Sequence, residues 1–181
     1  MDKDTLAKII DDHHKWLQDS SKGARANLSY ANLSYANLLS ANLRSADLSS
    51  ANLSSADLSY ANLSSANLRH ANLRSADLRY AKIASVLWCA PTTVLLANWG
   101  TCSDNLTIEL MRYDAYNHED PYSFDLWVAD NTYPFGETKY QRAAHFTEKR
   151  ELWPGWNPRK KVKSAYELMQ LLLAEKCEAS E

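Results

Sequence analysis

The sequence predicts a β-solenoid, a column of short stacked coils, with an N-terminal capping helix and a mainly α-helical C-terminal domain. Three observations predict it: an uninterrupted repeat from Ala26 to Ser85, an amphipathic stretch before the repeat, and a change of composition after it. A repeat of fixed period takes precedence over local propensity when a fold is inferred. The expected domains are therefore residues 1–25, 26–85 and 86–181.

The repeat consists of twelve five-residue units, ANLSY ANLSY ANLLS ANLRS ADLSS ANLSS ADLSY ANLSS ANLRH ANLRS ADLRY AKIAS. In an α-helix a step of five residues turns about 500°, so the leucines would spread around the axis. In one straight strand they would alternate between the two faces. If the chain turns a corner after each unit, every Leu and the Ala before it can point inward. A coiled column satisfies the pattern.

This tandem A(N/D)LXX pattern resembles the pentapeptide-repeat family. The resemblance implies a right-handed quadrilateral β-helix with four units per coil, so that the twelve units make three coils. In that register the inward aliphatic residues form four stacks, which are Leu28, Leu48, Leu68; Leu33, Leu53, Leu73; Leu38, Leu58, Leu78; and Leu43, Leu63, Ile83.

Residues 4–19 form the amphipathic stretch before the repeat. Its apolar residues recur at helical spacing, and acidic residues precede it, as at a helix N-terminus. An open coil end exposes leucines and backbone groups, so we expect this helix to cap the column. His13 and His14 have no third ligand nearby, which favours a partly exposed helix face over a metal site.

The position after each Leu points outward and carries the arginines. Arg69, Arg74 and Arg79 fall at one level of the last coil, and Lys82 lies on the fourth side. Because Arg makes bidentate contacts with carboxylates and phosphates, this basic belt is a candidate site for an acidic partner. The alternative interpretation is a solvated face that protects the edge or pairs with the C-terminal domain.

The next position carries the tyrosines. Tyr60 is expected directly below Tyr80 on one face, and Tyr30 and Tyr35 lie in the first coil. Stacked tyrosines are a candidate contact patch, or they stabilise one another as a ladder. The Asn or Asp before each Leu is expected to bond to the backbone of the turn.

After Ser85 the period stops, and all five prolines and five of the six tryptophans follow. Trp88 and its neighbours are expected to cover the last coil. Residues 92–98 are apolar and β-branched, which suits one short strand or simple packing on the column.

Four helical signals follow in the C-terminal region. Ser103 is an N-cap residue, and Ser164 with Glu167 forms a capping box before an apolar helix. That last helix is wide enough to dimerise the chain, or it caps or fills the core. The expected helices lie in SDNLTIELMRYDAYNH, which Ser103 opens, in DPYSFDLWVAD, in residues 141–152 and in ELMQLLLAEKC. Phe124, Leu126, Trp127 and Val128 are expected to be buried in the second, and Leu168, Met169, Leu171 and Leu172 lie on the apolar face of the last.

The order ANWG, SDNL, ELMRYDA, QRAAHF and LMQLLLAEKC, from Leu95 to Cys177, is similar to regions behind pentapeptide repeats in bacteriophage and prophage proteins of unassigned function. The resemblance implies a biological context and no activity.

Composition limits the classes of function. The net charge is −2, and residues 26–85 carry five bases and three acids, so no region is a polyanion or a strong polycation. Three scattered cysteines suit reduced thiols, and no apolar run reaches membrane-spanning length. We expect a cytoplasmic protein without membrane contact.

Asp114 and His118, four residues apart, are the best candidates for chemistry. No nucleophile motif, phosphate loop or metal motif accompanies them, so we expect neither catalysis nor a cofactor. The basic run at residues 157–163 and the tryptophans of Trp153–Trp156 are interpreted as a solvated turn and a packed turn; the alternatives are a nucleic-acid contact, which the acidic surroundings disfavour, and a partner anchor.

The sequence therefore predicts a non-enzymatic interaction module that binds a protein partner through Arg69, Arg74, Arg79, Tyr60 and Tyr80. The family resemblance offers a second function, protection of a topoisomerase by mimicry of DNA. Three coils with a net charge of +2 over residues 26–85 present neither the length nor the sign that mimicry requires. A small enzyme built on the C-terminal domain is the third alternative.

Overall fold

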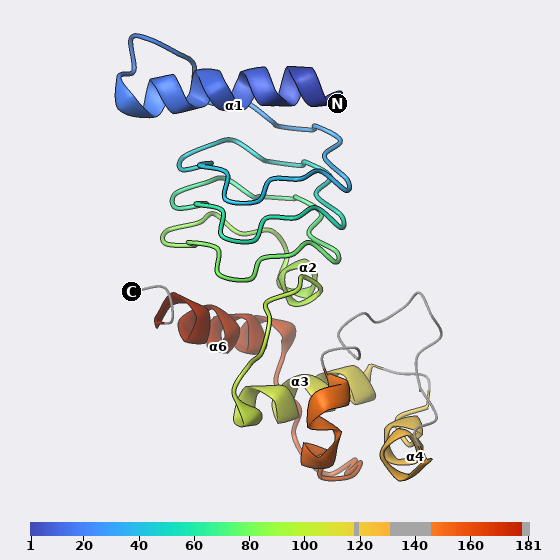
Figure 1. Ribbon diagram of the computed structural model, residues 1–181. Helices are drawn as coiled ribbons and strands as arrows, with labels where there is room; N and C mark the ends of the chain where they lie inside the picture. Colours follow the sequence, from blue (N-terminus) through green and yellow to red (C-terminus); the bar gives the residue numbers. More distant parts are fainter. Residues whose placement is uncertain (118–119, 131–145, 179–181) are drawn as a thin grey trace. The chain divides into compact units, whose positions relative to one another are not determined.

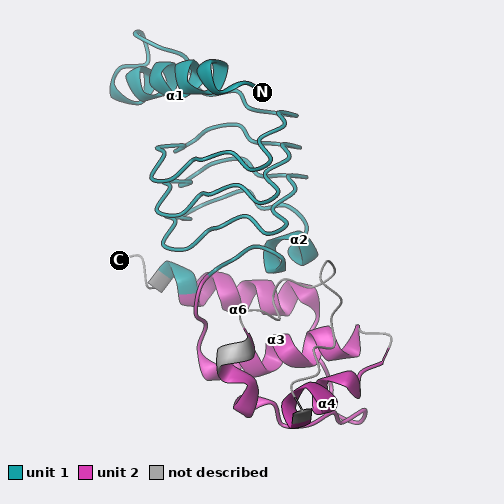
Figure 2. Cartoon of the chain, turned by 45° about the vertical axis from the view of Figure 1, so that its right-hand side comes forward, with its two compact units in different colours: residues 1–99, 176–181 teal, residues 100–175 magenta. Residues whose placement is uncertain are grey.

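The computed structural model describes residues 1–117, 120–130 and 146–178. The chain divides into two compact units (Figure 2). The first consists of Met1–Trp99 with Lys176–Glu181, and the second of Gly100–Glu175. The five-residue repeat lies entirely in the first unit.

The repeat forms a column of stacked four-sided coils (Figure 1). Parallel bridges join each unit to the unit twenty residues later, as in the series Asn27, Asp47 and Asn67. The predicted register of four units per coil is therefore confirmed. The inward leucines are at most 2% exposed and Ile83 is 4% exposed, so the four predicted aliphatic stacks fill the middle of the column.

The sides of the column are not strands. Within the described residues the pairing consists of isolated bridges, one residue per side in each coil. The expectation of a β-helix is corrected in this respect. The reason is geometric, because only about three residues separate successive corners, and a strand ladder usually needs more.

Each corner is a tight turn with an uncommon backbone conformation. In the first unit the Ala31 N–H donates to the Leu28 carbonyl (3.2 Å), and Tyr30 has a φ of 57°. A positive φ at the third residue is the mark of a type II turn, where Gly or Asn is usual. The equivalent residue of all twelve units has a φ between 56° and 62°, and none is Gly.

The Asn or Asp before each Leu bonds to its own turn, as predicted. Asn27 Oδ1, for example, accepts the backbone N–H of Ser29 (3.1 Å). The same bond recurs in every unit that has Asn or Asp at this position. The last unit has Lys82 there, which cannot accept such a bond.

The column continues past the point where the period stops. Leu87 pairs with Asn67, and Asn98 pairs with Asp77 on a different side. Between them lies a short helix, α2 (Pro91–Leu95), with Pro at its start. The suggestion of a strand at residues 92–98 is therefore wrong, and the first compact unit extends to Trp99. The buried side chains Val94, Leu95 and Trp99 close this end.

The N-terminal helix α1 (Lys3–Gln18) lies across the other end of the column (Figure 1). Its more buried residues follow a helical stripe, Leu6, Ile9, Ile10, His13, Trp16 and Leu17. His13 is completely buried, so its interpretation as part of an exposed face is wrong; His14 is exposed. His13 faces the column because it falls one turn from Ile9 and Ile10 on the same stripe.

Gly23 lets the chain turn back beneath α1. A Cβ atom at this residue would lie 2.1 Å from the Asp12 carbonyl oxygen and 2.7 Å from the Trp16 nitrogen. Both are backbone atoms, so a side chain has no room. The next residue, Ala24, donates its N–H to the same Asp12 carbonyl (3.2 Å), which ties the returning chain to the helix.

The regular elements described in the second unit are all helical. They are α3 (Asp104–Tyr116), α4 (Ser123–Asp130), the 3₁₀ helix η1 (Thr147–Leu152) and α6 (Ala165–Glu178). Ser103 caps α3, and the predicted capping box of α6 is present, with the Glu167 N–H donating to Ser164 Oγ (3.2 Å) and the Ser164 N–H to Glu167 Oε2 (2.7 Å). Residues 141–145 of the helix predicted over residues 141–152 lie outside the described residues; most of the remainder is η1, a 3₁₀ helix rather than an α-helix.

Aromatic side chains form part of the core of this unit, together with aliphatic side chains of α3 and α6. Phe124 and Trp127 of α4 are buried as predicted, and Trp153 packs on Phe124 with a ring-centroid distance of 5.2 Å. Leu126 is 55% exposed, so its predicted burial is wrong. Leu171, predicted on the apolar face of α6, is 45% exposed and lies at the edge of that face beside the buried Leu168. No helix within the described ranges is long and apolar enough to span a membrane.

Candidate interaction surface

The two side chains after each Leu form the outer surface of the column. Because the coil repeats every twenty residues, outward positions stack in columns of three, one from each coil. The side that contains Asp57 and Asp77 carries three exposed large apolar side chains, Leu39, Tyr60 and Tyr80. We call it the tyrosine face, and it consists of Asn37, Leu39, Ser40, Asp57, Ser59, Tyr60, Asp77, Arg79 and Tyr80.

Tyr60 and Tyr80 stack on this face, as the register predicted. Their ring centroids are 4.8 Å apart and the rings are inclined by 20°. Tyr60 is 58% exposed and Tyr80 is 71% exposed. The pair therefore presents a broad apolar surface with two hydroxyl groups on a backbone held by bridges.

Leu39 belongs to the same face and was not predicted as part of the site. It is 51% exposed and occupies the outward position that is Ser in half of the units. The sequence could have indicated this residue, because a leucine at an outward position cannot pack in the core of the column. Ser59, at the equivalent position of the next coil, is buried and donates from Oγ to Asp57 Oδ1 (2.5 Å).

The three arginines of the predicted belt lie at one level but on three different sides. All are exposed. Arg79 is held by Asp77 in a bidentate ion pair, with Nη2 2.5 Å from Oδ2 and Nε 2.9 Å from Oδ1. Arg69 and Arg74 project from the two preceding sides. The three arginines therefore face three different directions around the column.

The remaining tyrosines are more exposed and unstacked. Tyr30 is 82% and Tyr35 is 81% exposed, at two successive corners of the first coil. They resemble Tyr60 and Tyr80 in residue type and turn position, with a φ of 57° and 59°. They serve as matched controls for the tyrosine face.

The candidate chemistry of the second unit is only partly within the described residues. Asp114 is buried in α3, whereas His118 and His145 lie outside the described ranges. Arg112 pairs with Glu109 on the same helix, at 2.6 Å between Nη1 and Oε1. Within the described residues, no group of three or more His, Cys, Asp and Glu side chains is arranged to hold a metal ion.

The Trp153–Trp156 turn is packed, as its first interpretation held. Asp125 Oδ1 accepts the indole N–H of Trp153 (2.6 Å) and the backbone N–H of Trp156 (3.0 Å). Gly155 has a φ of 83°, a conformation that favours glycine. Trp153 is buried and Trp156 is half-buried, so the turn is fixed to α4 while one indole remains accessible.

The first unit has the architecture of a tandem-repeat solenoid with four five-residue units per coil. The family model described as pentapeptide repeats (8 copies) matches residues 24–59 and 56–85. Residues 24–85 thus match the pentapeptide-repeat family, and the match is confined to this segment.

Solved structures of other pentapeptide-repeat proteins are similar to part of the chain. One from Nostoc Pcc 7120 is 32% identical and matches 45% of this chain and 60% of its own, with a TM-score of 0.38. HetL from Nostoc sp. Strain PCC 7120, involved in heterocyst differentiation regulation, is 37% identical. The match covers 42% of this chain and 35% of HetL, with a TM-score of 0.22. One from the Arabidopsis thaliana thylakoid lumen is 16% identical, with 52% and 78% covered and a TM-score of 0.27.

The match thus spans 60% of the first Nostoc protein and 35% of HetL. No curated protein matches the sequence.

Proposed function

We propose that the chain is a non-enzymatic interaction module whose repeat column, wound right-handed as in the family it resembles, is a scaffold for binding a protein partner. The contact surface is the tyrosine face, with Leu39, Tyr60 and Tyr80 as its apolar part. The observation that carries this proposal is the exposed Tyr60–Tyr80 stack on a backbone held by bridges above and below.

The tyrosine stack is not required by the fold. Ser40 occupies the same corner as Tyr60 in the preceding coil, and serine is the commonest residue at the last position of the repeat unit. Tyr is enriched in protein interfaces because it combines a large apolar area with a hydroxyl group and few rotatable bonds. A rigid column also loses little conformational entropy when a partner binds.

Charge at the edge of the face gives the contact its polar part. Arg79 and Asp77 neutralise one another beside Tyr80, and Arg74 projects from the neighbouring side. Such a mixed edge suits a partner with both acidic and apolar side chains. The phage context implied by the C-terminal resemblance would make that partner a host protein.

Mimicry of DNA receives less support from the same surface. The repeat carries only Asp47, Asp57 and Asp77 as acids, and Asp77 is paired with Arg79. Five basic residues share the column with them. A field of the opposite sign to that of duplex DNA follows, and it cannot replace a row of phosphates.

Affinity capture with paired variants tests the proposal. Tyr60→Ser/Tyr80→Ser removes the stack by using the residue already found at equivalent corners, and Tyr30→Ser/Tyr35→Ser is the matched control. We expect one defined protein to be captured by the wild type and by the control but not by the Tyr60/Tyr80 variant. Binding between the purified chain and that purified protein is then measured. An identical set of captured proteins for both variants would reject the tyrosine face as the contact surface.

A further inference from the structure

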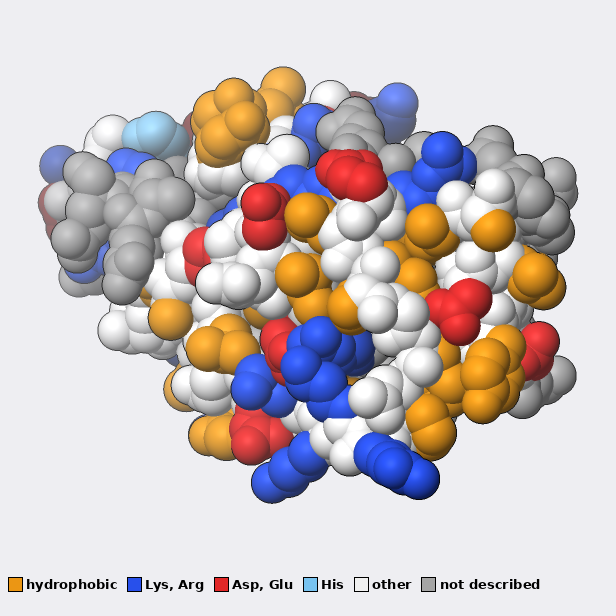
Figure 3. Space-filling view, turned by 90° about the horizontal axis from the view of Figure 1, so that it is seen from below, with side chains coloured by type: hydrophobic (Ala, Val, Ile, Leu, Met, Phe, Trp, Pro, Cys, Tyr) orange, Lys and Arg blue, Asp and Glu red, His pale blue; other side chains and the backbone are white. Residues whose placement is uncertain are grey.

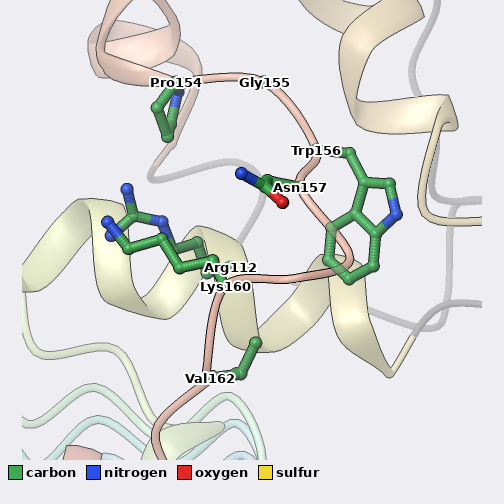
Figure 4. Close-up of a pocket in the computed structure, with 7 residues that line it drawn as sticks. All are labelled: Arg112, Pro154, Gly155, Trp156, Asn157, Lys160 and Val162. Carbon is green, nitrogen blue, oxygen red and sulfur yellow. The ribbon is translucent and has the colours of Figure 1, made fainter.

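The second unit contains a small pocket that the proposed function does not use. It has a volume of about 190 Å³ and is lined by Arg112, Pro154, Gly155, Trp156, Asn157, Lys160 and Val162. Figure 4 shows Arg112 of α3 on one side and Trp156 on the other, with Pro154 and Gly155 along the connecting turn. The basic residue Arg112 thus lies across the pocket from the aromatic residue Trp156.

Positive charge is in excess around this pocket. Arg112 and Lys160 both line it, and Glu109 is the carboxylate paired with Arg112 (2.6 Å). The same carboxylate lies 3.8 Å from Lys163 Nζ. Among the described ion pairs, one carboxylate therefore serves two cations while Lys160 adds a third. An anion in the pocket would relieve this imbalance.

Arg112 retains donors for a ligand. Its guanidinium carries five N–H donors, and Glu109 takes one from Nη1. Its side chain is only 15% exposed, so the charge has little water around it. An anion that reaches this group gains more than it would from a fully solvated arginine.

The turn that supplies the other wall is fixed before any ligand arrives. The backbone N–H of Trp156 is bonded to Asp125, and Asn157 Oδ1 accepts the backbone N–H of Arg159 (3.0 Å). The Lys160 N–H donates to the Asn157 carbonyl (3.1 Å), which closes the turn that carries Lys160. A ligand would then lose less free energy to ordering of the protein.

We propose that this pocket binds a small organic anion, a carboxylate or phosphate monoester attached to a planar group. The anion lies between Arg112 and Lys160, and the planar group lies against Trp156 and Val162. The pocket is smaller than typical ligand sites of about 300–1,000 Å³, so its occupant is the size of a single ring. The exposed base Arg159 belongs to the same turn. Figure 3 shows Lys and Arg side chains gathered beside hydrophobic ones on one face.

Titration of the folded chain, followed by the indole N–H signals in NMR, tests the site. The probes are phenyl phosphate, benzoate and inorganic phosphate at constant ionic strength, and Trp156→Phe assigns the Trp156 signal. We expect phenyl phosphate or benzoate to produce a saturable shift of that signal, and inorganic phosphate to bind more weakly. Whichever of the two organic probes binds more tightly identifies the anionic group.

Two neighbouring lysines provide the matched pair of variants. Lys160 lines the pocket and Lys161 does not, and both are exposed, so neither is needed for folding. Lys160→Ala should weaken binding about tenfold, the loss expected for one charged hydrogen bond. Lys161→Ala should leave the affinity unchanged.

Two outcomes would overturn the proposal. One is the absence of a saturable shift with either organic probe. The other is equal weakening by Lys160→Ala and Lys161→Ala, which would mean general attraction to a basic surface. Neither result bears on the tyrosine face, since the pocket and that face belong to different units.

Discussion

Single residues at the corners of the column are held in a conformation that their side chains disfavour. Ser55 has a φ of 56°, and its N–H donates to the Arg74 carbonyl in the coil above (2.9 Å). A left-handed conformation costs about 1–2 kcal/mol for a residue with a Cβ atom. In this unit the ladder bond and the burial of the adjacent Leu53 offset this cost.

Ser55→Val should be destabilising because β-branched side chains fit a positive φ least well. Ser54→Val is the matched control, since Ser54 is the same residue type in the same turn without a positive φ. We expect Ser55→Val to lose about 1–2 kcal/mol more than the control in urea unfolding. Equal stability of the two variants would contradict the assigned turn geometry.

Lys82 occupies the position where the other repeat units have Asn or Asp. Lys82→Asn should add the missing side-chain bond to the backbone N–H of Ala84 and raise the free energy of unfolding by about 1 kcal/mol. Lys82→Gln removes the charge but is too long for this turn, so it should not stabilise. An equal rise in the free energy of unfolding of both variants would mean that removal of the positive charge, and not the new hydrogen bond, stabilises the column.

At the scale of elements, the contact between α1 and the first coil includes one buried imidazole. His13 Nδ1 accepts the backbone N–H of Ala26 (3.1 Å), and Trp16 stacks on the ring at 5.6 Å. His13 Nε2 is buried without a hydrogen-bond partner among the described residues. Protonation of Nδ1 would remove the acceptor that Ala26 uses, so the cap requires the neutral ring.

Burial lowers the pKa of His13 below its usual 6.5, and the charges of Arg25 and His14 act in the same direction, while the Arg44 backbone acts against them. Because the folded protein binds this proton less readily than the unfolded chain, the contribution of His13 to stability is complete above pH 6.5 and declines as the pH falls below it. Unfolding in urea between pH 7.5 and 5 should show this decline.

His13→Asn supplies an acceptor at the position of Nδ1 that does not titrate, and it should flatten this part of the pH dependence. His14→Asn, the exposed neighbour, should retain the dependence of the wild type. If His14→Asn flattened the profile and His13→Asn did not, the role of the buried ring would be refuted.

For the whole molecule, the sequence was sufficient to predict the structure of the repeat, where every unit follows the same five-residue pattern. The four aliphatic stacks, the Asx bonds and the Tyr60–Tyr80 stack all follow from a corner after every fifth residue. The positive φ at each corner was not predictable from residue type, because Ser, Tyr and His replace the usual Gly. The close stacking of the coils favours it, which is a tertiary effect.

Prediction was weaker where no period guides it. The burial of His13, the exposure of Leu126 and the Arg79–Asp77 pair depend on which neighbour each side chain meets. The pocket at Arg112 brings α3 together with a turn more than forty residues later. Such a juxtaposition depends on packing in the second unit, and neither segment carries a motif for it.

The register of twenty residues per coil is the claim on which the tyrosine face depends, and crosslinking of paired cysteines tests it most directly. Ser55→Cys/Ser75→Cys places two thiols on one corner column, about 4.8 Å apart along the coil axis; Ser50→Cys/Ser65→Cys places them on different sides. With oxidation or a short bis-methanethiosulfonate, mapped by mass spectrometry, we expect an intrachain link in the first pair and none in the second. A link in the second pair without one in the first would contradict the account.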